Sequence, residues 1–499
     1  MKALEERAFA EGVSAETLME EVGAQIAETV QRYFPQPGRC AVHFGKGHNG
    51  GDALVAARVL VSLGWTLDVR PAFPEAEWSE LTGRKYRQLG EWSGSGWHVL
   101  EKERNETFIA GRLIVLDGLL GIGAGGALRE PILSAAREIN RLRDEDNAHV
   151  FAIDVPTGLD GDTGIAQADA VRADFTLTIG FAKRGLVADS ATPHVGRLAV
   201  LPLRELTARA AGAGADPALV SSVAELAPLL PRRRFDVHKG DFGRIGIVAG
   251  SRGLTGAAIL AAEACVRAGA GLVSLYVTED IHAIVASSTS AEVMVKPIGS
   301  YLDVLDTNRD VLAVGPGLGT HRREEALELI RRAEQPMIID ADGLNVLSTD
   351  LGTLDSCAGA RLLTPHPGEM ARLDPDFKSR SRREAVDAFT ARSPHALLLK
   401  GSRTIIGQRG RPVAYNTTGS AGMSTGGMGD VLTGVCAALA GHGLTLYDAA
   451  RVASWLCGRA AELAIYHGRD SEESFSANTL LDWLGPAFRA LRGESTPAL

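Results

Sequence analysis

Cysteine, aromatic residues and long apolar runs are all scarce in this 499-residue chain, and each shortage excludes a class of protein. The five cysteines are scattered and form no CxxC pair, which favours a reducing compartment and argues against a zinc site. Aromatic residues make up 5% of the chain, too few for the stacking surfaces that bind single-stranded nucleic acid. The net charge of −9 also argues against a nucleic-acid surface.

Segments that could enter a membrane are missing as well. The longest apolar run, Ala257–Val277, is interrupted by Glu263 and Arg267, so it does not suit a bilayer span. The first residues, Met1–Glu11, are charged and lack the apolar core of a signal peptide. We therefore expect a cytoplasmic protein that binds neither membrane nor nucleic acid.

Strand-like and helix-like segments alternate through both halves of the chain. Short apolar runs typical of buried strands are Cys40–Phe44, Leu113–Leu116, Val150–Ile153, Phe175–Ile179, Ile245–Val248, Leu272–Val277, Val311–Val314, Met337–Ile339, Leu362–Thr364 and Leu397–Leu399. Helical patterns cover Met19–Val30, Ala53–Leu63, Ala257–Ala268, Arg323–Ala333, Val431–Ala440 and Asp448–Tyr466. This alternation predicts an α/β protein with two open, mainly parallel sheets flanked by helices.

An Ala- and Gly-rich tract with weak strand signals separates the two predicted sheets, and part of it could be helical. A chain of 499 residues exceeds the size of one ordinary domain. We therefore expect one domain at residues 1–206, a linker at 207–220 and a second domain at 221–499.

The most informative segment is the glycine-dense loop Ser420–Asp430, which leads directly into an apolar helix. Such a loop presents unpaired backbone N–H groups and the positive end of the helix dipole, and both favour phosphate. Asp430 would repel a phosphate, so we interpret it as a general base that takes a proton from a hydroxyl attacking a phosphoryl group. The simpler alternative is an aspartate favoured in the first helical turn.

In open parallel sheets, ligands bind beyond the carboxyl ends of the strands. Three predicted strand ends in the first half are followed by Asn49, Asp117 and Asp154, with glycine-rich loops beside them. Oxygen-bearing side chains of this kind suit a hard cation such as potassium or magnesium better than zinc. Asp154 could instead be a turn former and Asp52 a residue of a helix start.

Strand ends in the second half carry a similar set of residues. They are followed by Gly250–Ala257, Gly315–Gly319, Asp340–Asn345, Pro365–Glu369 and Lys400–Thr404. The last of these could place a lysine and hydroxyl groups near phosphate. His366 alone would more often be structural, but the two prolines beside it fix it at the ligand edge.

The second half resembles the ADP-dependent NAD(P)H-hydrate dehydratases, a branch of the ribokinase-like fold. The matching motifs are His238-Lys-Gly-Asp-Phe-Gly243, Gly256-Ala-Ala, Arg267-Ala-Gly-Ala-Gly-Leu-Val273, Gly315-Pro-Gly-Leu-Gly319, Asp340-Ala-Asp-Gly343, Thr364-Pro-His-Pro-Gly-Glu369, Lys400-Gly401 and Gly426-Gly-Met-Gly-Asp430. The first half resembles the NAD(P)H-hydrate epimerases. Its motifs are Leu18-Met-Glu-Glu-Val-Gly23, Gly47-His-Asn-Gly-Gly-Asp52, Leu116-Asp-Gly-Leu-Leu-Gly121 and Ile153-Asp-Val-Pro-Thr-Gly-Leu-Asp160.

These resemblances imply an N-terminal Rossmann-like three-layer α/β domain fused to a C-terminal ribokinase-like α/β domain. The implied function is repair of NADH and NADPH hydrates. The first domain would epimerise the R and S forms, and the second would dehydrate the S form while converting ADP to AMP and phosphate. Potassium in the first domain and magnesium in the second are the implied cofactors, and a homo-oligomer is the implied assembly.

The resemblance also implies roles for individual residues. In the dehydratase, Asp430 would be catalytic, the hydrate pocket would be formed by Ala257, Gly317, His366 and Asp430, and ADP would be bound by Lys400, Gly401, Ser402, Arg403, Thr404 and Gly429. In the epimerase, Asp154 would be catalytic, potassium would be held by Asn49, Asp117 and Thr157, and the hydrate would be bound by His48, Asn49, Gly50, Gly51, Asp52, Gly121, Ile122, Gly123, Ala124, Gly125, Gly126, Ala127 and Asp154.

The first half departs from the family pattern in three residues and one loop. His48 stands where an asparagine is usual, Ala53 where a glycine is usual, and Thr157 where a serine is usual. The glycine loop 121–127 is less tight than in the family. Thr157 keeps a hydroxyl ligand, whereas Ala53 would add a Cβ near the expected phosphate path and His48 could perturb binding.

Two other interpretations remain open from the sequence. The second domain could be a small-molecule kinase of the ribokinase type, acting on vitamin-precursor alcohols, because those enzymes share the Gly-Gly-x-Gly-Asp pattern. The first domain could be a non-catalytic binding module.

Overall fold

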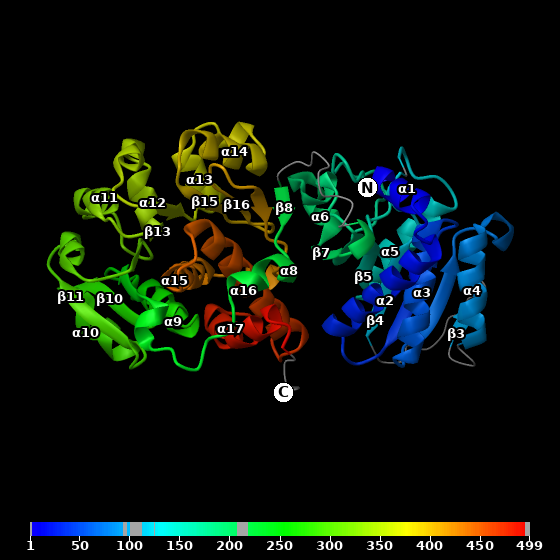
Figure 1. Ribbon diagram of the computed structural model, residues 1–499, viewed down its shortest axis with the longest axis horizontal. Coiled ribbons are helices and arrows are strands. Elements are labelled where there is room, and N and C mark those ends of the chain that lie inside the picture. Colours follow the sequence, from blue (N-terminus) through cyan, green and yellow to red (C-terminus); the bar gives the residue numbers. More distant parts are fainter. Residues whose placement is uncertain (1, 93–96, 100–111, 124, 207–217, 495–499) are drawn as a thin grey trace. The chain divides into compact units, whose positions relative to one another are not determined.

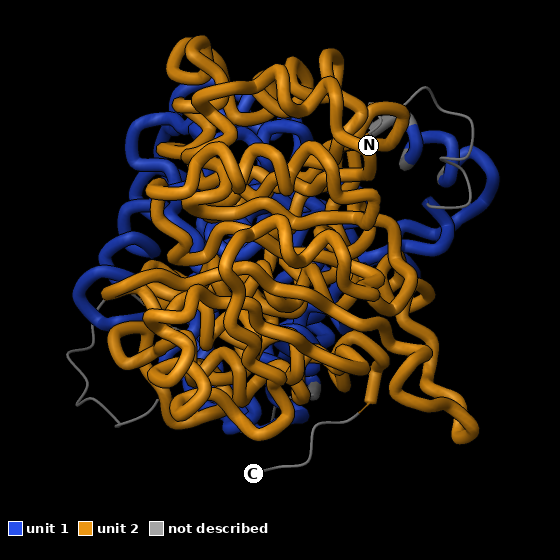
Figure 2. Tube along the Cα trace, turned by 90° about the vertical axis from the view of Figure 1, so that its left-hand side faces the viewer, with its two compact units in different colours: residues 1–215 blue, residues 216–499 orange. Residues whose placement is uncertain are grey.

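The computed structural model describes residues 2–92, 97–99, 112–123, 125–206 and 218–494. The chain forms two compact units, residues 1–215 (unit 1) and 216–499 (unit 2), coloured separately in Figure 2. The division between them falls within the predicted linker, of which residues 207–217 lie outside the described residues. No helix among the described residues is long and apolar enough to cross a bilayer.

Unit 1 contains a seven-stranded, wholly parallel sheet with the order β3-β2-β1-β4-β5-β6-β7, of which β3, β4, β5 and β7 are labelled in Figure 1. Its strands are β1 Arg39–Phe44, β2 Thr66–Pro71, β3 Trp97–Val99, β4 Leu113–Gly118, β5 His149–Ile153, β6 Phe175–Ile179 and β7 Arg197–Leu201. Its helices are α1 Lys2–Ala10, α2 Ala15–Tyr33, α3 His48–Ser62, α4 Glu80–Trp92, α5 Ile132–Glu145 and α6 Thr192–Val195.

Helices cover both faces of this sheet. The central strands are therefore buried on both sides. Val115 of β4 and Val150 of β5 pack against α5 in one apolar cluster. On the other face, α3 approaches β4 so closely that a Cβ on Gly118 would lie 2.6 Å from the Cβ of Ala53. Apolar strands buried on both sides are typical of doubly covered parallel sheets.

Unit 2 contains a ten-stranded sheet with the order β11-β10-β9-β12-β13-β14-β15-β16-β17-β8. It is parallel except at β16, which is antiparallel to both β15 and β17. Its strands are β8 Ala218–Val220, β9 Arg244–Val248, β10 Leu272–Thr278, β11 Val293–Ile298, β12 Val311–Val314, β13 Met337–Ile339, β14 Arg361–Leu363, β15 Ala396–Leu399, β16 Ile405–Gly407 and β17 Val413–Tyr415.

Helices of several lengths accompany the strands of unit 2. They are α8 Val223–Leu226, α9 Thr255–Arg267, α10 Glu279–Ser288, α11 Arg323–Arg332, α12 Asp342–Leu347, α13 Pro367–Leu373, α14 Arg382–Arg392, α15 Met428–Gly441, α16 Leu446–Tyr466 and α17 Ala477–Leu491. Helices α9, α15, α16 and α17 share one buried cluster with the sheet. Gly434 lets α15 touch α9, since a Cβ there would lie 2.1 Å from the Ala261 carbonyl oxygen.

The predicted α/β architecture, with two mainly parallel sheets, is confirmed. Every strand predicted from the apolar runs is present, most of them with ends within one or two residues of those expected. The predicted linker is wrong at its C-terminal end, because residues 218–220 form β8 and pair with β17. The composition of Ala218–Val220 is too ordinary to reveal a strand whose partner lies almost 200 residues later in the chain.

Candidate active sites at the strand ends

Three oxygen-bearing side chains of unit 1 meet around the backbone that follows β4. Asp117, which is fully buried, accepts the hydroxyl of Thr157 at 2.7 Å and its backbone N–H at 2.8 Å. The Thr157 hydroxyl in turn accepts the Leu120 N–H at 3.2 Å. The side-chain amide of Asn49 donates to the Leu120 carbonyl at 2.9 Å. The structure thus brings together the three residues for which the family resemblance implies potassium binding.

Asp117 is held in an environment that disfavours its charge. Burial raises the pKa of its carboxyl to about 6, and the hydrogen bonds from Thr157 and the Leu119 N–H only partly oppose this. A cation nearby would stabilise the charged form, because an opposite charge at short range favours ionisation of an acid. The donor set of one carboxylate, one hydroxyl and one amide oxygen therefore fits a singly charged hard cation.

Asp154 follows β5 and lies in a buried polar cluster of its own. Its backbone has a φ of 65°, a left-handed conformation that non-glycine residues adopt rarely and often at functional sites. Its Oδ1 atom accepts the Ile179 N–H at 3.1 Å and forms a short ion pair with Lys183. The Lys183 ammonium also donates to the Thr178 hydroxyl at 2.9 Å. A carboxylate and an ammonium are thus held together at the end of β6.

The glycine-rich segments predicted to bind the hydrate lie beside these groups. His48 is exposed at the start of α3, and Asp52 is buried one turn later. The described part of the loop 121–127 is half-buried to exposed, while Ala124 lies outside the described residues. Gly50 permits a close turn here, since a Cβ would lie 2.1 Å from the Gly45 carbonyl oxygen.

Ala53 does not lie on the expected phosphate path. Its methyl group is fully buried and faces Gly118 of β4 rather than the surface of the loop. The expectation that this alanine would crowd the ligand is therefore wrong. Sequence position alone placed Ala53 next to Asp52, but one residue along a helix turns the side chain by about 100° onto the sheet-facing side.

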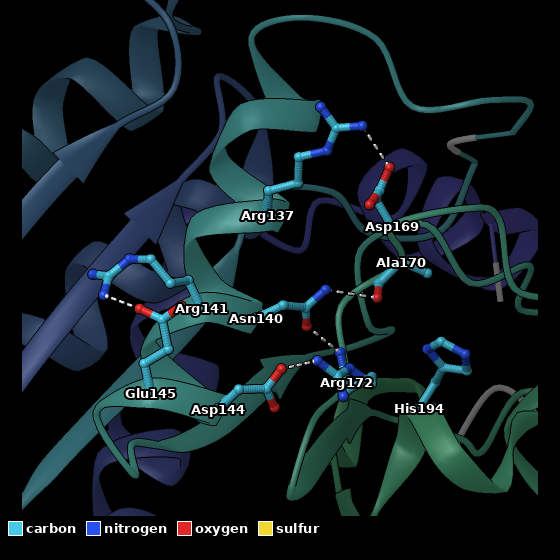
Figure 3. A pocket seen from close by; sticks show the side chains of 9 residues that line it. All are labelled: Arg137, Asn140, Arg141, Asp144, Glu145, Asp169, Ala170, Arg172 and His194. Atoms are coloured by element: carbon cyan, nitrogen blue, oxygen red, sulfur yellow. Dashed lines mark hydrogen bonds and ion pairs between the residues drawn. The ribbon is translucent and has the colours of Figure 1, made fainter.

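An open surface hollow of about 410 Å³ in unit 1 is unrelated to these groups (Figure 3). Its lining residues belong to α5 or precede strands β6 and β7, so it lies at the amino edge of the sheet. Its arginines are already paired, Arg137 with Asp169 at 2.9 Å and Arg172 with Asp144. Ligands of open parallel sheets bind at the opposite edge.

In unit 2 a buried carboxylate lies at the centre of the site. Asp340, which follows β13 and is 1% exposed, accepts the Lys400 ammonium at 2.7 Å on Oδ1 and the Thr433 hydroxyl at 2.8 Å on Oδ2. Lys400 lies 3.7 Å from the buried Glu369 as well. Burial acts to lower the pKa of Lys400, but Asp340 and Glu369 outweigh it and raise this pKa. The lysine is therefore charged and held between two carboxylates.

Asp430 lies in the first turn of α15, directly after the glycine loop. Burial raises the pKa of its carboxyl to about 7, and the nearby charge of Asp340 adds to this, while Lys400 opposes it. Gly429 brings the loop onto the cluster, because a Cβ there would lie 3.3 Å from the Lys400 ammonium. A carboxyl with this pKa can accept a proton near neutral pH, as a general base must.

The residues predicted to line the hydrate pocket come from four elements: Ala257 lies in α9, Gly317 in the loop after β12, His366 at the start of α13 and Asp430 in α15. Gly317 adopts a left-handed φ of 60° and packs against α9, where a Cβ would lie 3.0 Å from that of Ala257. His366 is exposed and begins α13, accepting the Gly368 N–H at 2.9 Å on Nδ1. Its Nε2 atom lies 3.6 Å from Glu369, the carboxylate beside Lys400.

The loop Lys400–Thr404, predicted to bind ADP, is exposed in only part of its length. Gly401 and Ser402 are exposed, whereas the Arg403 side chain is only 2% exposed and Thr404 is also buried. The Lys400 ammonium already binds Asp340. Gly401 and Ser402 are thus the residues of the loop that are open to a ligand.

Three polar residues of these sites received no role from the sequence. Lys183 follows β6, so the rule that was applied to the other strand ends would have found it. Asp340 stood among the strand-end residues without an assignment. Thr433 is a fully buried polar residue in an apolar helix, three positions after Asp430 and so on the same helix face.

Comparison with known proteins matches both units. The family model for NAD(P)H-hydrate dehydratase matches residues 245–474, and the model described as YjeF-related protein N-terminus matches residues 15–185. The bifunctional NAD(P)H-hydrate repair enzyme of Moorella thermoacetica is 36% identical, over 96% of this chain and 93% of that protein. The enzyme of the same name from Coxiella burnetii is 32% identical, over 94% of each chain.

A solved structure is also similar to unit 2. The ADP/ATP-dependent NAD(P)H-hydrate dehydratase from Bacillus subtilis, co-crystallised with ATP and Mg²⁺, is 26% identical. It covers 55% of this chain and 98% of that chain, with a TM-score of 0.47. The full-length similarity to the two bacterial relatives is what decides the family: this chain belongs to the bifunctional NAD(P)H-hydrate repair enzymes.

Proposed function

We propose that this protein repairs hydrated NADH and NADPH. Unit 1 interconverts the R and S epimers of the hydrate, and unit 2 dehydrates the S epimer while converting ADP to AMP and phosphate. The observation that carries the proposal is similarity over nearly the whole length of bifunctional repair enzymes. Each unit also has a buried aspartate at the carboxyl edge of its sheet, Asp154 in unit 1 and Asp340 in unit 2, where such chemistry would take place.

In unit 2 the proton acceptor is Asp430. The hydroxyl oxygen on carbon six of the hydrate attacks the terminal phosphorus of ADP, AMP leaves, and Asp430 takes the hydroxyl proton. The carbon–oxygen bond of the resulting phosphate ester then breaks, carbon five loses a proton, and NADH and phosphate are formed. The N–H groups of the Gly426–Gly429 loop, at the start of α15, are suited to stabilise charge on the transferring phosphoryl group.

Magnesium would enter this site together with ADP. When bound, it neutralises charge on the phosphate oxygens. Asp340 and Glu369 are already paired with the Lys400 ammonium, so we assign the metal to the diphosphate rather than to these carboxylates. Because the Lys400 ammonium offsets their charge, these two carboxylates can lie close to Asp430 without repelling the bound nucleotide.

In unit 1 the acid–base group is Asp154. Its carboxylate is buried, lies at the carboxyl edge of the sheet and pairs with the Lys183 ammonium. We assign Lys183 the role of holding the Asp154 carboxylate in place through their ion pair while protons are exchanged at the hydrate. Potassium would be held by Asn49, Asp117 and Thr157, where it would fix the loop after β4 beside the ligand.

The alternative of a vitamin-precursor kinase fused to a non-catalytic module is not favoured. The relatives that match the whole chain are repair enzymes, and the epimerase-like half is present together with the dehydratase-like half. Localisation in the cytoplasm and assembly into a homo-oligomer remain parts of the proposal. Light scattering of the purified protein would give the number of copies.

The decisive experiment mixes the purified protein with both epimers of NADH hydrate, ADP and magnesium. We expect the absorbance of reduced nicotinamide to return in full. In an Asp154→Asn variant, rapid recovery should stop at the S-epimer fraction. No recovery, with ADP left intact, would refute the dehydratase, and a stable phosphorylated product would point to a kinase.

A further inference from the structure

A short buried segment connects the two parts of unit 2 that are proposed to bind ADP. Residues 416–419, which we call the connecting segment, follow β17 and lead into the glycine loop. At its start, the Asn416 N–H donates to the Thr404 carbonyl at 2.8 Å, at the end of the Lys400–Thr404 loop. At its end, Gly419 leads into Ser420 and the loop. Any shift of the connecting segment would therefore move both loops.

The connecting segment is tied to α16 by buried polar side chains. Asn416 and Thr418 are 4% and 6% exposed. The Asn416 side-chain amide donates to the Ser454 carbonyl of α16 at 3.1 Å. The Thr418 hydroxyl lies 2.9 Å from the Asn416 side-chain oxygen and 3.1 Å from the Trp455 carbonyl, either of which can accept its proton.

A second contact fixes the far end of the connecting segment. The Gly419 N–H donates to Oε1 of Glu462 at 3.1 Å, and the other oxygen of Glu462 accepts the Arg459 guanidinium at 2.9 Å. Glu462 is 1% exposed and Arg459 is 8% exposed. A buried carboxylate in this position gives a strong hydrogen bond to a backbone amide.

The surface of α16 is shaped to let the segment approach closely. Gly458 lies under Thr418, and a Cβ at this position would be 2.2 Å from the Thr418 hydroxyl oxygen and 2.6 Å from its carbonyl carbon. Real Cβ atoms do not come that close to their neighbours. A glycine in the middle of a 21-residue helix costs helix stability, so its presence points to a close approach that the packing requires.

We propose that Asn416, Thr418, Gly458 and Glu462 are positioning residues for ADP. They do not touch the reacting atoms, but hold the connecting segment so that both ADP-binding loops keep the geometry that phosphate requires. The inference rests on the proposed ADP-dependent reaction. Backbone N–H groups bind phosphate well only when they are fixed in advance. The same holds for the reaction, since a misplacement of about 1 Å is enough to lower its rate strongly.

The test removes one hydroxyl without changing the shape of the side chain. In Thr418→Val, the KM for ADP should rise about five-fold, the loss expected for one buried hydrogen bond. Thr418→Ser keeps the hydroxyl and should return the KM to within about two-fold of the unchanged protein. The epimerase activity of the same samples should not change, since it belongs to unit 1.

Thr353→Val serves as the matched control. Thr353 is 2% exposed and its hydroxyl bonds Asp350 at 3.1 Å, but it precedes β14, at the edge of the sheet opposite to the ADP loops. We expect the KM for ADP to be unchanged in this variant, whatever its effect on thermal stability. If Thr418→Val lowers stability as Thr353→Val does but leaves the KM for ADP unchanged, the positioning role is overturned.

Gly458→Ala tests the same role from the side of α16. The added methyl group should push the connecting segment away and raise the KM for ADP by about ten-fold or more, while α16 itself gains helix propensity. Calorimetric titration of each variant with ADP and Mg²⁺ should show the same ranking of dissociation constants. If the unchanged protein binds ADP but consumes none, the proposed function fails while the binding series still tests the positioning role.

Discussion

The two units place a lysine differently beside their candidate catalytic aspartates. In unit 1, Lys183 pairs directly with Asp154. In unit 2, Lys400 pairs with Asp340 and approaches Glu369, and the pKa of Asp430 rises to about 7 through burial and the charge of Asp340. The same edge of the same type of sheet can therefore pair a carboxylate directly with an ammonium group or keep a carboxylate ready to accept a proton.

The largest expected effect comes from removing the proton acceptor of unit 2. Asp430→Asn should lower kcat for dehydration of the S epimer about 10³-fold, the usual contribution of a general base. The rate of epimerisation, measured by chromatography of the two epimers, should equal that of the unchanged protein. Loss of both activities would show that the two sites are not independent, and the comparison would fail.

The second prediction concerns a buried arginine that stabilises unit 2. Arg361 is fully buried and donates to the carbonyls of Ile330, Gln335, Ala333 and Ala360, which include the C-terminal end of α11. Arg361→Leu should lower the free energy of unfolding of unit 2 by about 3 kcal/mol in urea, because these carbonyls lose their buried donors.

The control for this prediction is Arg409→Leu. Arg409 also binds two carbonyls near the end of a helix, those of Thr390 and Ala391, but it is exposed. We expect its loss to cost less than about 0.5 kcal/mol. Equal losses in the two variants would mean that burial does not decide the strength of these bonds.

The third prediction concerns the lysine of unit 1. Lys183→Met should lower the rate of epimerisation about 10²-fold, because the Asp154 carboxylate loses the ammonium group that holds it in position. Dehydration of pure S epimer should be unaffected. A variant that epimerises normally would assign the ion pair a purely structural role.

The fourth prediction shifts a pH profile. The general base must be deprotonated, so kcat/KM for dehydration should rise with pH through about 7, the pKa of Asp430. Asp340→Asn removes the neighbouring negative charge and should move this rise to lower pH by about one unit. Asp482→Asn, at an acid whose side chain is 69% exposed in α17, should leave the profile in place. An upward shift in Asp340→Asn would contradict the assignment of Asp430.

The smallest effect is expected for potassium. Replacing it with choline should lower the epimerase rate, and it should lower the melting temperature of unit 1 by a few degrees. The melting temperature of unit 2 should not change. In Asp117→Asn the two salts should give the same melting temperature. A potassium effect that survives in this variant would place the ion elsewhere.

The sequence predicted the parts of these sites that depend on local pattern. Buried runs such as Val311–Val314 stand out by their apolar residues, and the strand-end rule then points to the loops behind them. It could not predict which partners those loops find. Asp340 and Lys400 are 60 positions apart, and Asp154 and Lys183 are 29 apart, so their pairing follows from strand order rather than from any local signal.

Short strands near one edge of the unit 2 sheet were missed for a related reason. Strands β16 and β17 have three residues each, and their stabilisation comes from pairing with neighbours rather than from their own composition. Ala53 shows the converse limit. Its chemistry is plain from the sequence, but the face of α3 on which it lies is decided by packing against Gly118.

Strand β8 has a practical consequence for anyone who wishes to produce unit 2 alone. It pairs in parallel with β17, and Ser221 extends the pairing by donating to the Tyr415 carbonyl at 2.8 Å. A chain cut at residue 221, where composition suggested that the domain begins, would leave the backbone of Val413–Tyr415 as an unpaired outer edge. Unpaired edges recruit strands from other molecules, so that fragment should aggregate more readily than one that retains Ala218–Val220, in which β8 covers the edge of β17.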